Sequence, residues 1–126
     1  MAKKVLIAED EPNIVESLSF LLERAGFEVS VKSDGREALD AALASVPDVL
    51  ILDVMLPSLD GYEILRQLKV DERTANLPVM MLTAKGQRED RETALKFGAD
   101  LFVTKPFSNA EIVEAVKDLA DPPNAE

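Results

Sequence analysis

The sequence predicts an α/β protein in which helices cover one doubly wound sheet of five parallel strands. Short runs rich in Val, Ile and Leu alternate with stretches whose apolar residues recur every three or four positions, which is typical of βαβ units. The chain has 126 residues, the length of one domain. Four of the apolar runs end on polar or charged residues, as strands do when their carboxyl ends form a site.

The strands are expected at the apolar runs, which are about residues 4–8, 27–31, 48–53, 78–82 and 100–104. Handedness and crossover rules make the order 2-1-3-4-5 a natural arrangement for five such strands. The first strand then neighbours the third at the point where the strand order reverses. Ligands of open parallel sheets bind at that point.

The first two helices follow from apolar spacing. Apolar residues recur at three- and four-residue steps from Ile14 to Ala25, which predicts an amphipathic helix. Pro12 suits its first turn and Gly26 suits its C-terminal cap. A shorter pattern predicts the second helix over about 35–45.

The third and the last helix are marked by their starts. The turn Ser58-Leu59-Asp60-Gly61 precedes the apolar positions of the third helix. The last helix is expected to begin after Ser108, and Glu111 three residues later completes a capping-box pattern.

The helix expected at about 87–97 differs from the others. Its first half, from Gln87 to Glu92, is almost entirely charged, and only Ala94, Leu95 and Phe97 are expected to face the core. Since such a helix gains little from burial, it should be the least stable one. It is open whether this is a solvated helix face, or a movable element or docking surface.

Composition excludes several classes of protein. The chain is 47% hydrophobic and 30% charged, and no apolar run reaches the roughly 20 residues of a membrane-spanning helix, so a cytoplasmic protein without membrane contact is expected. Its net charge of −10 argues against direct nucleic-acid binding, because phosphates favour a basic surface. The acidity leaves open a solubilising surface, a metal site or a surface for a basic partner.

Cysteine and histidine are both absent. Disulfides, zinc thiolate sites and thiol nucleophiles are therefore excluded. So are histidine general bases, histidine metal ligands and a phosphohistidine made by the chain itself. Any chemistry must use carboxylates, hydroxyls and lysines.

Polar residues at four strand ends are expected to meet at one edge of the sheet. Asp53 ends the third apolar run, Glu9 and Asp10 follow the first, Thr83 follows the fourth, and Lys105 follows the fifth. Singly, such residues are common at helix starts and turns. Their joint placement is what indicates a site.

Three carboxylates this close repel one another, by about 4 kcal/mol for unit charges at 4 Å and an effective dielectric of 20. The cluster must bind a cation, take up protons or accept the strain. Mg²⁺ is the simplest relief, because it prefers oxygen ligands and phosphate. Lys105 and Thr83 would then hold phosphoryl oxygens, which favours phosphoryl chemistry on Asp53.

The motifs of the chain come in a specific order and at specific spacings. They are Ala8-Glu9-Asp10-Glu11, Leu52-Asp53-Val54-Met55-Leu56-Pro57, Asp60-Gly61, Leu82-Thr83-Ala84-Lys85, Gly98-Ala99-Asp100 and Val103-Thr104-Lys105-Pro106-Phe107. In this set the chain resembles the response-regulator receiver domains of two-component signalling, which are CheY-like, over about residues 3–120. The domain is accordingly expected to cover 1–120, with 121–126 as a short tail.

The resemblance implies a flavodoxin-like fold and a stand-alone, Mg²⁺-dependent phosphoacceptor switch. It implies that Asp53 receives a phosphoryl group from a partner histidine kinase or histidine phosphotransfer protein. It also implies that Asp10, Asp53 and the Met55 backbone carbonyl bind Mg²⁺, with Glu9 acting mainly through a water. The chain would catalyse only its own phosphorylation and dephosphorylation, and its output would be changed binding to a downstream protein.

The resemblance assigns further roles. Thr83 and Lys105 would bind phosphoryl oxygens. Phe102 stands where the family carries a rotating aromatic coupled to that threonine, although an ordinary core phenylalanine is the alternative. Met55 and Lys85 stand where side chains tune the access of water to the acyl phosphate.

The chain departs from the commonest family pattern at two places. Glu9 replaces the more familiar first aspartate, which leaves the metal geometry open. Leu101 and Ala115 stand where receivers that dimerise through the fourth helix, fifth strand and fifth helix carry charges, so that dimer is not expected.

Two alternative functions remain open. A phosphatase or phosphotransferase of the haloacid-dehalogenase type would want a second aspartate two residues after the nucleophile, and Met55 stands there. The other alternative is a docking module or a receiver fragment of a longer hybrid kinase or transcription factor. The starting Met1 and the short tail favour a complete chain.

Overall fold

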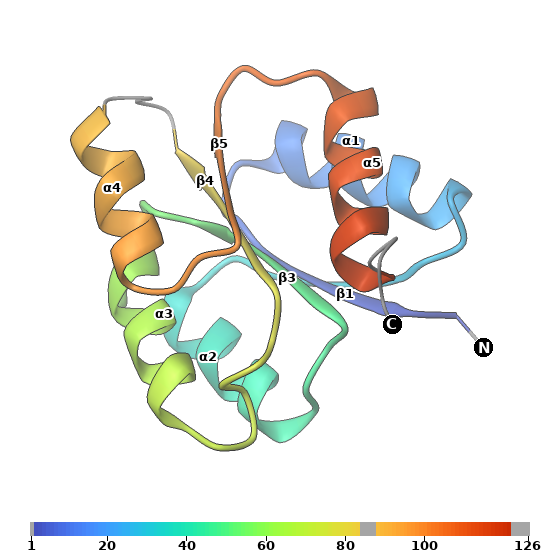
Figure 1. Ribbon diagram of the computed structural model, residues 1–126. Coiled ribbons are helices and arrows are strands. Elements are labelled where there is room, and N and C mark those ends of the chain that lie inside the picture. The colour runs from blue at the N-terminus through green and yellow to red at the C-terminus, as the bar shows by residue number, and fades with distance from the viewer. Residues whose placement is uncertain (1, 84–87, 122–126) are drawn as a thin grey trace.

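The computed structural model describes residues 2–83 and 88–121 and has the predicted α/β architecture (Figure 1). Its five parallel strands form one sheet in the order β2-β1-β3-β4-β5, as predicted. The strands are β1 (Lys4–Ala8), β2 (Glu28–Lys32), β3 (Val49–Asp53), β4 (Val79–Thr83) and β5 (Leu101–Thr104). The helices are α1 (Pro12–Arg24), α2 (Gly35–Ala44), α3 (Gly61–Val70), α4 (Arg88–Lys96) and α5 (Asn109–Ala120). Several predicted ends, such as 27–31 for the second strand and 35–45 for the second helix, differ from these bounds by a residue.

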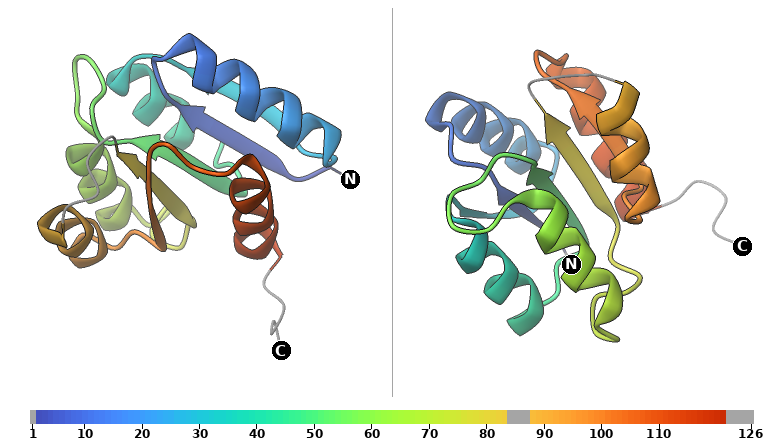
Figure 2. Two further views of the ribbon diagram at one scale, coloured as in Figure 1. Left: turned by 90° about the horizontal axis from the view of Figure 1, so that it is seen from above. Right: turned by 90° about the vertical axis from the view of Figure 1, so that its left-hand side faces the viewer.

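The helices cover both faces of the sheet. α1 and α5 lie on one face, and α2, α3 and α4 lie on the other (Figure 2). Side chains alternate along each strand, so the core divides into two clusters. β3 is buried along its whole length, as expected for a parallel strand with helices above and below it. Within the described residues, no helix is both long and apolar enough to cross a membrane.

Among the described residues, three helices begin at a side-chain cap that accepts a hydrogen bond from the backbone N–H three residues on. The pairs are Asp34 with Glu37 at 3.0 Å, Asp60 with Glu63 at 3.0 Å, and Ser108 with Glu111 at 3.5 Å. The Ser108 cap agrees with the prediction. The two aspartate caps are additional, although the spacing of Asp and Glu is the capping-box spacing in both.

The ends of α1 agree with the prediction. Pro12 is its first residue, where the missing N–H has no intrahelical partner to lose. Gly26 follows the helix with a φ of +100°, in the left-handed region that glycine adopts without a steric penalty.

α4 buries less than predicted. Ala94 is fully buried, but Leu95 is 50% exposed, so the prediction that Leu95 faces the core is wrong. Successive residues of a helix point about 100° apart, so the neighbour of a buried residue turns toward solvent. Phe97 lies just beyond the helix and is 36% exposed, with its ring centroid 6.1 Å from that of Tyr62.

Candidate functional site

The register of the sheet brings Glu9 and Asp53 to the same level. β1 and β3 pair in parallel with Ala8 opposite Leu52. Glu9 follows Ala8 and Asp53 follows Leu52, so the two carboxylates come at the same level of the sheet. Ile7 and Ile51 belong to the core cluster beneath α1 and α5. Because side chains alternate, Glu9 and Asp53 are expected on that same side of the sheet.

Thr83 and Lys105 come from the neighbouring strand pair. Thr83 lies opposite Thr104, and the backbone N–H of Lys105 donates to the carbonyl of Thr83 at 2.7 Å. Thr83 and Phe102 are both buried, at 5% exposure each. The alternation of β4 and β5 puts these two residues on the face covered by α2, α3 and α4, one strand apart.

Lys105 supplies a positive charge to the site. Its Nζ lies 3.0 Å from Oε1 of Glu9 and 3.5 Å from Oδ2 of Asp53. Glu9 is completely buried and Asp53 is 3% exposed, whereas Asp10 is exposed. A buried charge is expensive unless it is paired, so the ammonium group stabilises both buried carboxylates.

Backbone N–H groups bind one oxygen of each buried carboxylate. Glu11 donates to Oε2 of Glu9 at 3.1 Å, and Met55 donates to Oδ1 of Asp53 at 3.3 Å. Oε1 of Glu9 is close enough to Lys105 for an ion pair, yet it has no hydrogen bond of acceptable geometry among the described residues. A buried acceptor of this kind has unused capacity for a cation or a water.

The acidic side chains fit a divalent metal ion. One carboxylate oxygen from each of Glu9, Asp10 and Asp53 lies within 4.8 Å of the others. Carboxylate oxygens are the ligands that hard cations such as Mg²⁺ prefer. With the incompletely bonded Oε1 of Glu9, this donor set can hold such an ion.

Burial, and then the charge of Glu9, raise the pKa of Asp53 from 3.8 to about 6, although Lys105 acts in the opposite direction. Burial also acts to lower the pKa of Lys105, but Glu9 and Asp53 outweigh it, so that pKa is raised overall. At neutral pH the site therefore contains a charged ammonium group and an Asp53 that is largely ionised.

The start of α3 packs directly against the end of β3. The backbone N–H of Gly61 donates to the carbonyl of Val54 at 2.8 Å. A Cβ on Gly61 would lie 2.5 Å from the backbone oxygen of Asp53, which is closer than real Cβ contacts. Glycine is therefore required here by close packing against the residue that carries the candidate phosphoacceptor.

The segment between β3 and α3 is also held from α2. The N–H of Gly35 donates to the carbonyl of Pro57 at 2.9 Å, and the N–H of Arg36 donates to Oγ of Ser58 at 3.3 Å. Ser58 has a φ of +66°, and a Cβ on Gly35 would lie 1.9 Å from the backbone oxygen of Leu59. This contact joins distant segments, so no local pattern in the sequence predicts it.

The structure brings Glu9, Asp10, Asp53 and Lys105 together, as the sequence predicts. The side chain of Met55 is 73% exposed, while its backbone reaches Asp53. The roles assigned to these residues, and to Thr83 and Phe102, stay predictions. Lys85 lies outside the described residues.

A groove of about 480 Å³ opens beside Lys105. It lies between α1 and the segment that follows β5, and its lining includes Asn13, Ile14, Ser17 and Phe107. Of the four clustered site residues, Lys105 is the one that lines this groove.

The family model described as "Response regulator receiver domain" matches residues 5–117. The alkaline phosphatase synthesis transcriptional regulatory protein PhoP of Bacillus subtilis (strain 168) is 46% identical over 117 residues, which are 93% of this chain and 48% of PhoP. The chain thus spans about half the length of this curated relative.

The solved structures that are similar over almost the whole chain include two receiver domains of histidine kinases. The signal receiver domain of a signal transduction histidine kinase from Syntrophus aciditrophicus has 34% sequence identity and a TM-score of 0.89, covering 99% of this chain and 95% of that one. The receiver domain of the sensor histidine kinase PA1611 from Pseudomonas aeruginosa PAO1 has a magnesium ion coordinated in its active site cleft. It has 29% identity and a TM-score of 0.87, covering 95% of this chain and 98% of that one.

Proposed function

The chain belongs to the response regulator receiver domains of two-component signalling, and from this premise we propose that it is a Mg²⁺-dependent switch phosphorylated on Asp53. One observation carries the proposal. Asp53 is a buried carboxylate that has an ammonium group at 3.5 Å and two further carboxylates in reach of one cation. A group placed in this way can accept a phosphoryl group, because the charges that accompany the transfer have partners.

Asp10, Asp53 and the backbone carbonyl of Met55 are the proposed ligands of Mg²⁺, with Glu9 acting through a water. The clustered carboxylates and the incompletely bonded Oε1 of Glu9 support this assignment. When bound, Mg²⁺ supplies positive charge that offsets the negative charge of the phosphoryl oxygens.

The nucleophile is a carboxylate oxygen of Asp53. It forms a bond to phosphorus as the P–N bond of a phosphohistidine breaks, and the bonding electrons leave with the imidazole nitrogen. Because the pKa of Asp53 is about 6, most of this carboxylate is ionised and ready at neutral pH. Lys105 and the hydroxyl group of Thr83 bind the phosphoryl oxygens that Asp53 acquires.

The proposed donor is a histidine kinase or a histidine phosphotransfer protein, in keeping with the receiver family. The 126 residues contain no histidine, so a donor phosphohistidine lies outside them. The groove beside Lys105 is the proposed approach for its phosphohistidine. Ile14 and Phe107 offer apolar contact there, and Asn13 and Ser17 offer hydrogen bonds.

The output is a change in binding to a downstream protein. Thr83 and Phe102 lie on the neighbouring strands β4 and β5, on the face of the sheet that α4 covers. A movement of Thr83 toward the phosphoryl group therefore changes the packing around Phe102. Under this proposal the chain turns over no separate substrate, and catalyses only its own phosphorylation and dephosphorylation.

A second candidate is a receiver that works as one part of a longer protein. Two similarities favour this candidate. The matched region makes up 48% of the length of PhoP, and the similar receiver domain from Syntrophus aciditrophicus is part of a histidine kinase. A stand-alone regulator and such a part share the same chemistry at Asp53.

The test is phosphorylation by a small donor. Incubation with Mg²⁺ and acetyl phosphate is expected to add one phosphoryl group, stable in acid and labile in base, as read by intact mass. Asp53→Asn is expected to abolish the adduct, while Asp40→Asn, a change of an exposed carboxylate on α2, leaves it unchanged. Equal labelling of both variants would exclude Asp53, and repeated turnover of a phosphate ester would indicate a phosphatase.

A further inference from the structure

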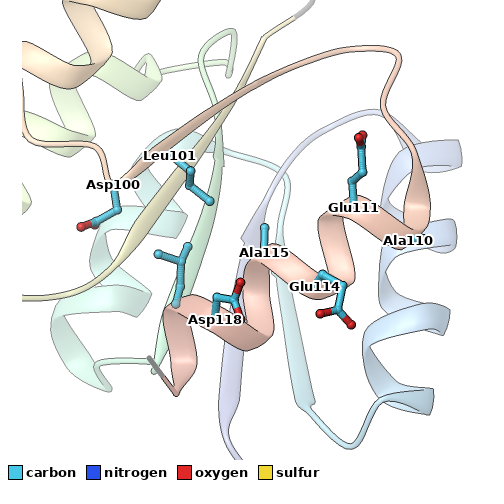
Figure 3. Close-up of a pocket in the computed structure, with 8 residues that line it drawn as sticks. Asp100, Leu101, Ala110, Glu111, Glu114, Ala115 and Asp118 are labelled. Carbon is cyan, nitrogen blue, oxygen red and sulfur yellow. The ribbon is translucent and has the colours of Figure 1, made fainter. Parts of the chain in front are cut away.

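Two segments that are far apart in the chain meet beside the candidate site. They are the α2 start (residues 34–37) and the β3–α3 segment (residues 54–60), and hydrogen bonds join them directly. Both follow the carboxyl ends of parallel strands, so they lie at the edge of the sheet that carries Asp53. A groove that Leu101 and acidic side chains of α5 line lies elsewhere, along α5 and the start of β5 (Figure 3). The contacts between the two segments are therefore the ones close to the backbone that carries Asp53.

The backbone of Ser58, within the β3–α3 segment, is strained. Its φ of +66° lies in the left-handed region, which residues other than glycine seldom adopt. The N–H of Leu59 donates to the carbonyl of Pro57 at 2.8 Å and closes a three-residue turn around Ser58. A γ-turn with a positive φ at its central residue is rare and strained. Such a conformation persists only where the surrounding structure fixes it.

The α2 start fixes this turn through its backbone. The N–H of Arg36 donates to Oγ of Ser58 at 3.3 Å. The N–H of Gly35 donates to the carbonyl of Pro57 at 2.9 Å, so that this carbonyl accepts two hydrogen bonds. The segments approach this closely because Gly35 has no Cβ, which would lie 1.9 Å from the backbone oxygen of Leu59.

Asp34 completes these contacts through its side chain. As the N-cap of α2, it accepts a hydrogen bond from the N–H of Glu37 at 3.0 Å. The hydrogen bond from the Glu37 backbone, and then the one from the Ser58 hydroxyl group, lower the pKa of Asp34. A hydroxyl group has one donor and two acceptor sites. Ser58 therefore uses its hydroxyl group both to accept from Arg36 and to donate to Asp34.

Met55 lies between Asp53 and the strained turn. Its N–H donates to Oδ1 of Asp53 at 3.3 Å, and its carbonyl is a proposed ligand of Mg²⁺. The N–H of Gly61 donates to the carbonyl of Val54 at 2.8 Å, which fixes the β3–α3 segment on the other side of Met55. With Val54 and Ser58 both held, the backbone of Met55 has little freedom to move.

Packing does not explain the strain at Ser58. The side chain is exposed, and a glycine would adopt this backbone conformation without a steric penalty. What serine adds is a hydroxyl group that bonds to the α2 start on two sides. Strain that the surrounding structure maintains is typical of sites whose geometry has to be fixed.

We propose that Ser58 is a positioning residue of the site. The α2 start holds Ser58 in the left-handed conformation, and this conformation sets the position of the Met55 backbone relative to Asp53. The consequence for Mg²⁺ rests on the proposed function, in which the Met55 carbonyl is a ligand. The ordering of the Met55 backbone does not rest on it and is measured on the metal-free chain.

Ser58→Gly separates positioning from stability. Glycine relieves the strain while the hydrogen bonds of the hydroxyl group are lost, so the Tm is expected to change by less than about 5 °C. The ¹⁵N order parameter of the Met55 amide is expected to fall from about 0.85, typical of rigid backbone, toward about 0.6. The Kd for Mg²⁺ is expected to rise about threefold to tenfold. A residue with only a structural role would change neither quantity while the Tm is kept.

Two further variants control for the substitution itself. Ser33→Gly makes the same chemical change at an exposed serine just before the α2 start, whereas the hydrogen bonds to the β3–α3 segment come from Gly35 and Arg36. It is expected to leave Met55 and the Kd unchanged. Ser58→Asn is the conservative replacement, because asparagine tolerates the left-handed region and offers a side-chain oxygen to Arg36. It is expected to restore the Kd to within about twofold of the wild-type value.

Asp34→Ala tests whether the α2 start acts through Ser58. Glu114→Ala also removes one carboxylate, but from α5 (Figure 3), so only Asp34→Ala is expected to lower the order parameter of Met55. In a Ser58→Gly background, Asp34→Ala is expected to lower it by less than about half as much, because the contact is already lost. Equal effects in both backgrounds would overturn the proposal, since Asp34 would then act only as the cap of α2.

An order parameter of Met55 that is the same in Ser58→Gly and in the wild-type chain would also overturn the proposal. A lowered order parameter with an unchanged Kd would overturn the role of Ser58 at the metal site. Failure of the proposed function looks different, because the wild-type chain would then neither bind Mg²⁺ nor accept a phosphoryl group from acetyl phosphate. The order parameters need no metal and decide the positioning of Met55 in either case.

Discussion

Lys105 lies closer to Glu9 than to Asp53, with its Nζ 3.0 Å from Oε1 of Glu9 and 3.5 Å from Oδ2 of Asp53. One ammonium group thus serves two buried carboxylates. It only partly offsets the effects of burial and of Glu9, because the pKa of Asp53 remains raised to about 6. A change at Glu9 therefore alters the charge that Asp53 experiences.

Glu9→Gln is expected to lower the pKa of Asp53. The variant removes the negative charge that, after burial, contributes most to the raised pKa, and it leaves Lys105 to pair with Asp53 alone. A carboxyl ¹³C titration of the metal-free protein measures this pKa. Glu11→Gln is the control, since Glu11 is exposed and contributes its backbone N–H to the site. An unchanged pKa in Glu9→Gln would contradict the proposed coupling.

The stability of the metal-free protein is expected to fall as the pH rises from about 5 to about 7.5. The pKa of Asp53 is raised from 3.8 to about 6 on folding, so the folded state binds this proton more tightly than the unfolded state. The resulting stabilisation is about 3 kcal/mol at most below the unfolded pKa of 3.8, declines above that pH and is lost as the pH rises through about 6, so about half of it, roughly 1.4 kcal/mol, is lost from pH 5 upward. Thermal unfolding in EDTA measures it.

Asp53→Asn is expected to remove this pH dependence and to raise the Tm at neutral pH. Glu63 and Asp71 have pKa values lowered to about 2 by hydrogen bonds from Arg66 and Arg73. These two groups change the stability in the opposite direction and over a more acid pH range. A carboxylate with a lowered pKa stabilises the folded state while it is ionised, and this stabilisation is lost as the pH falls and the group takes up a proton. A Tm of Asp53→Asn that still falls between about pH 5 and pH 7.5 would assign the effect to another group.

Mg²⁺ is expected to raise the Tm at neutral pH in a concentration-dependent manner. An ion that binds only the folded state adds about 2.7 kcal/mol at a hundred times its Kd. Asp10→Asn is expected to weaken the effect, because it removes a proposed ligand while leaving the buried pair of Glu9 and Lys105 in place. Asp40→Asn serves as the control on α2. No stabilisation at millimolar Mg²⁺ would contradict the metal site.

Gly35→Ala is expected to destabilise the protein by about 1–3 kcal/mol or more, because the new Cβ would lie 1.9 Å from the backbone oxygen of Leu59. Urea unfolding measures this. Gly26→Ala is the comparison: its Cβ meets nothing within 4 Å, and only its φ of +100° is unfavourable, at about 1–2 kcal/mol. A smaller loss of stability for Gly35→Ala than for Gly26→Ala would mean that the start of α2 and the segment around Leu59 can move apart at little cost in free energy.

Ser19→Ala is expected to stabilise the protein by about 0.5–2 kcal/mol. Oγ of Ser19 is buried and has no hydrogen-bond partner among the described residues, and alanine also favours the helix more. Ser17→Ala in the same helix is the control, because Ser17 is exposed and only helix propensity changes there. Equal gains in the two variants would indicate that the hydroxyl group of Ser19 is satisfied in solution.

The strand ends illustrate what local patterns can predict. Asp53 and Thr83 each follow a run of apolar residues that need a buried position. The run predicts a buried parallel strand, and the polar residue at its end predicts the edge of the sheet where the site lies. Leu95 shows where such reasoning fails. It has the hydrophobicity of a core residue, yet its neighbour Ala94 takes the buried position of a short helix.

The sequence by itself determined the fold class, the order of the strands and the set of polar residues that end them, because these depend on the apolar period and on the handedness of crossovers. Only the tertiary structure decided which carboxylate Lys105 contacts more closely, that Gly35 packs on Leu59, and that Leu101 and α5 line an acid-rimmed groove. These relations join residues far apart in the chain. They depend on distances of a few ångströms between elements, and no local pattern of residues specifies such distances.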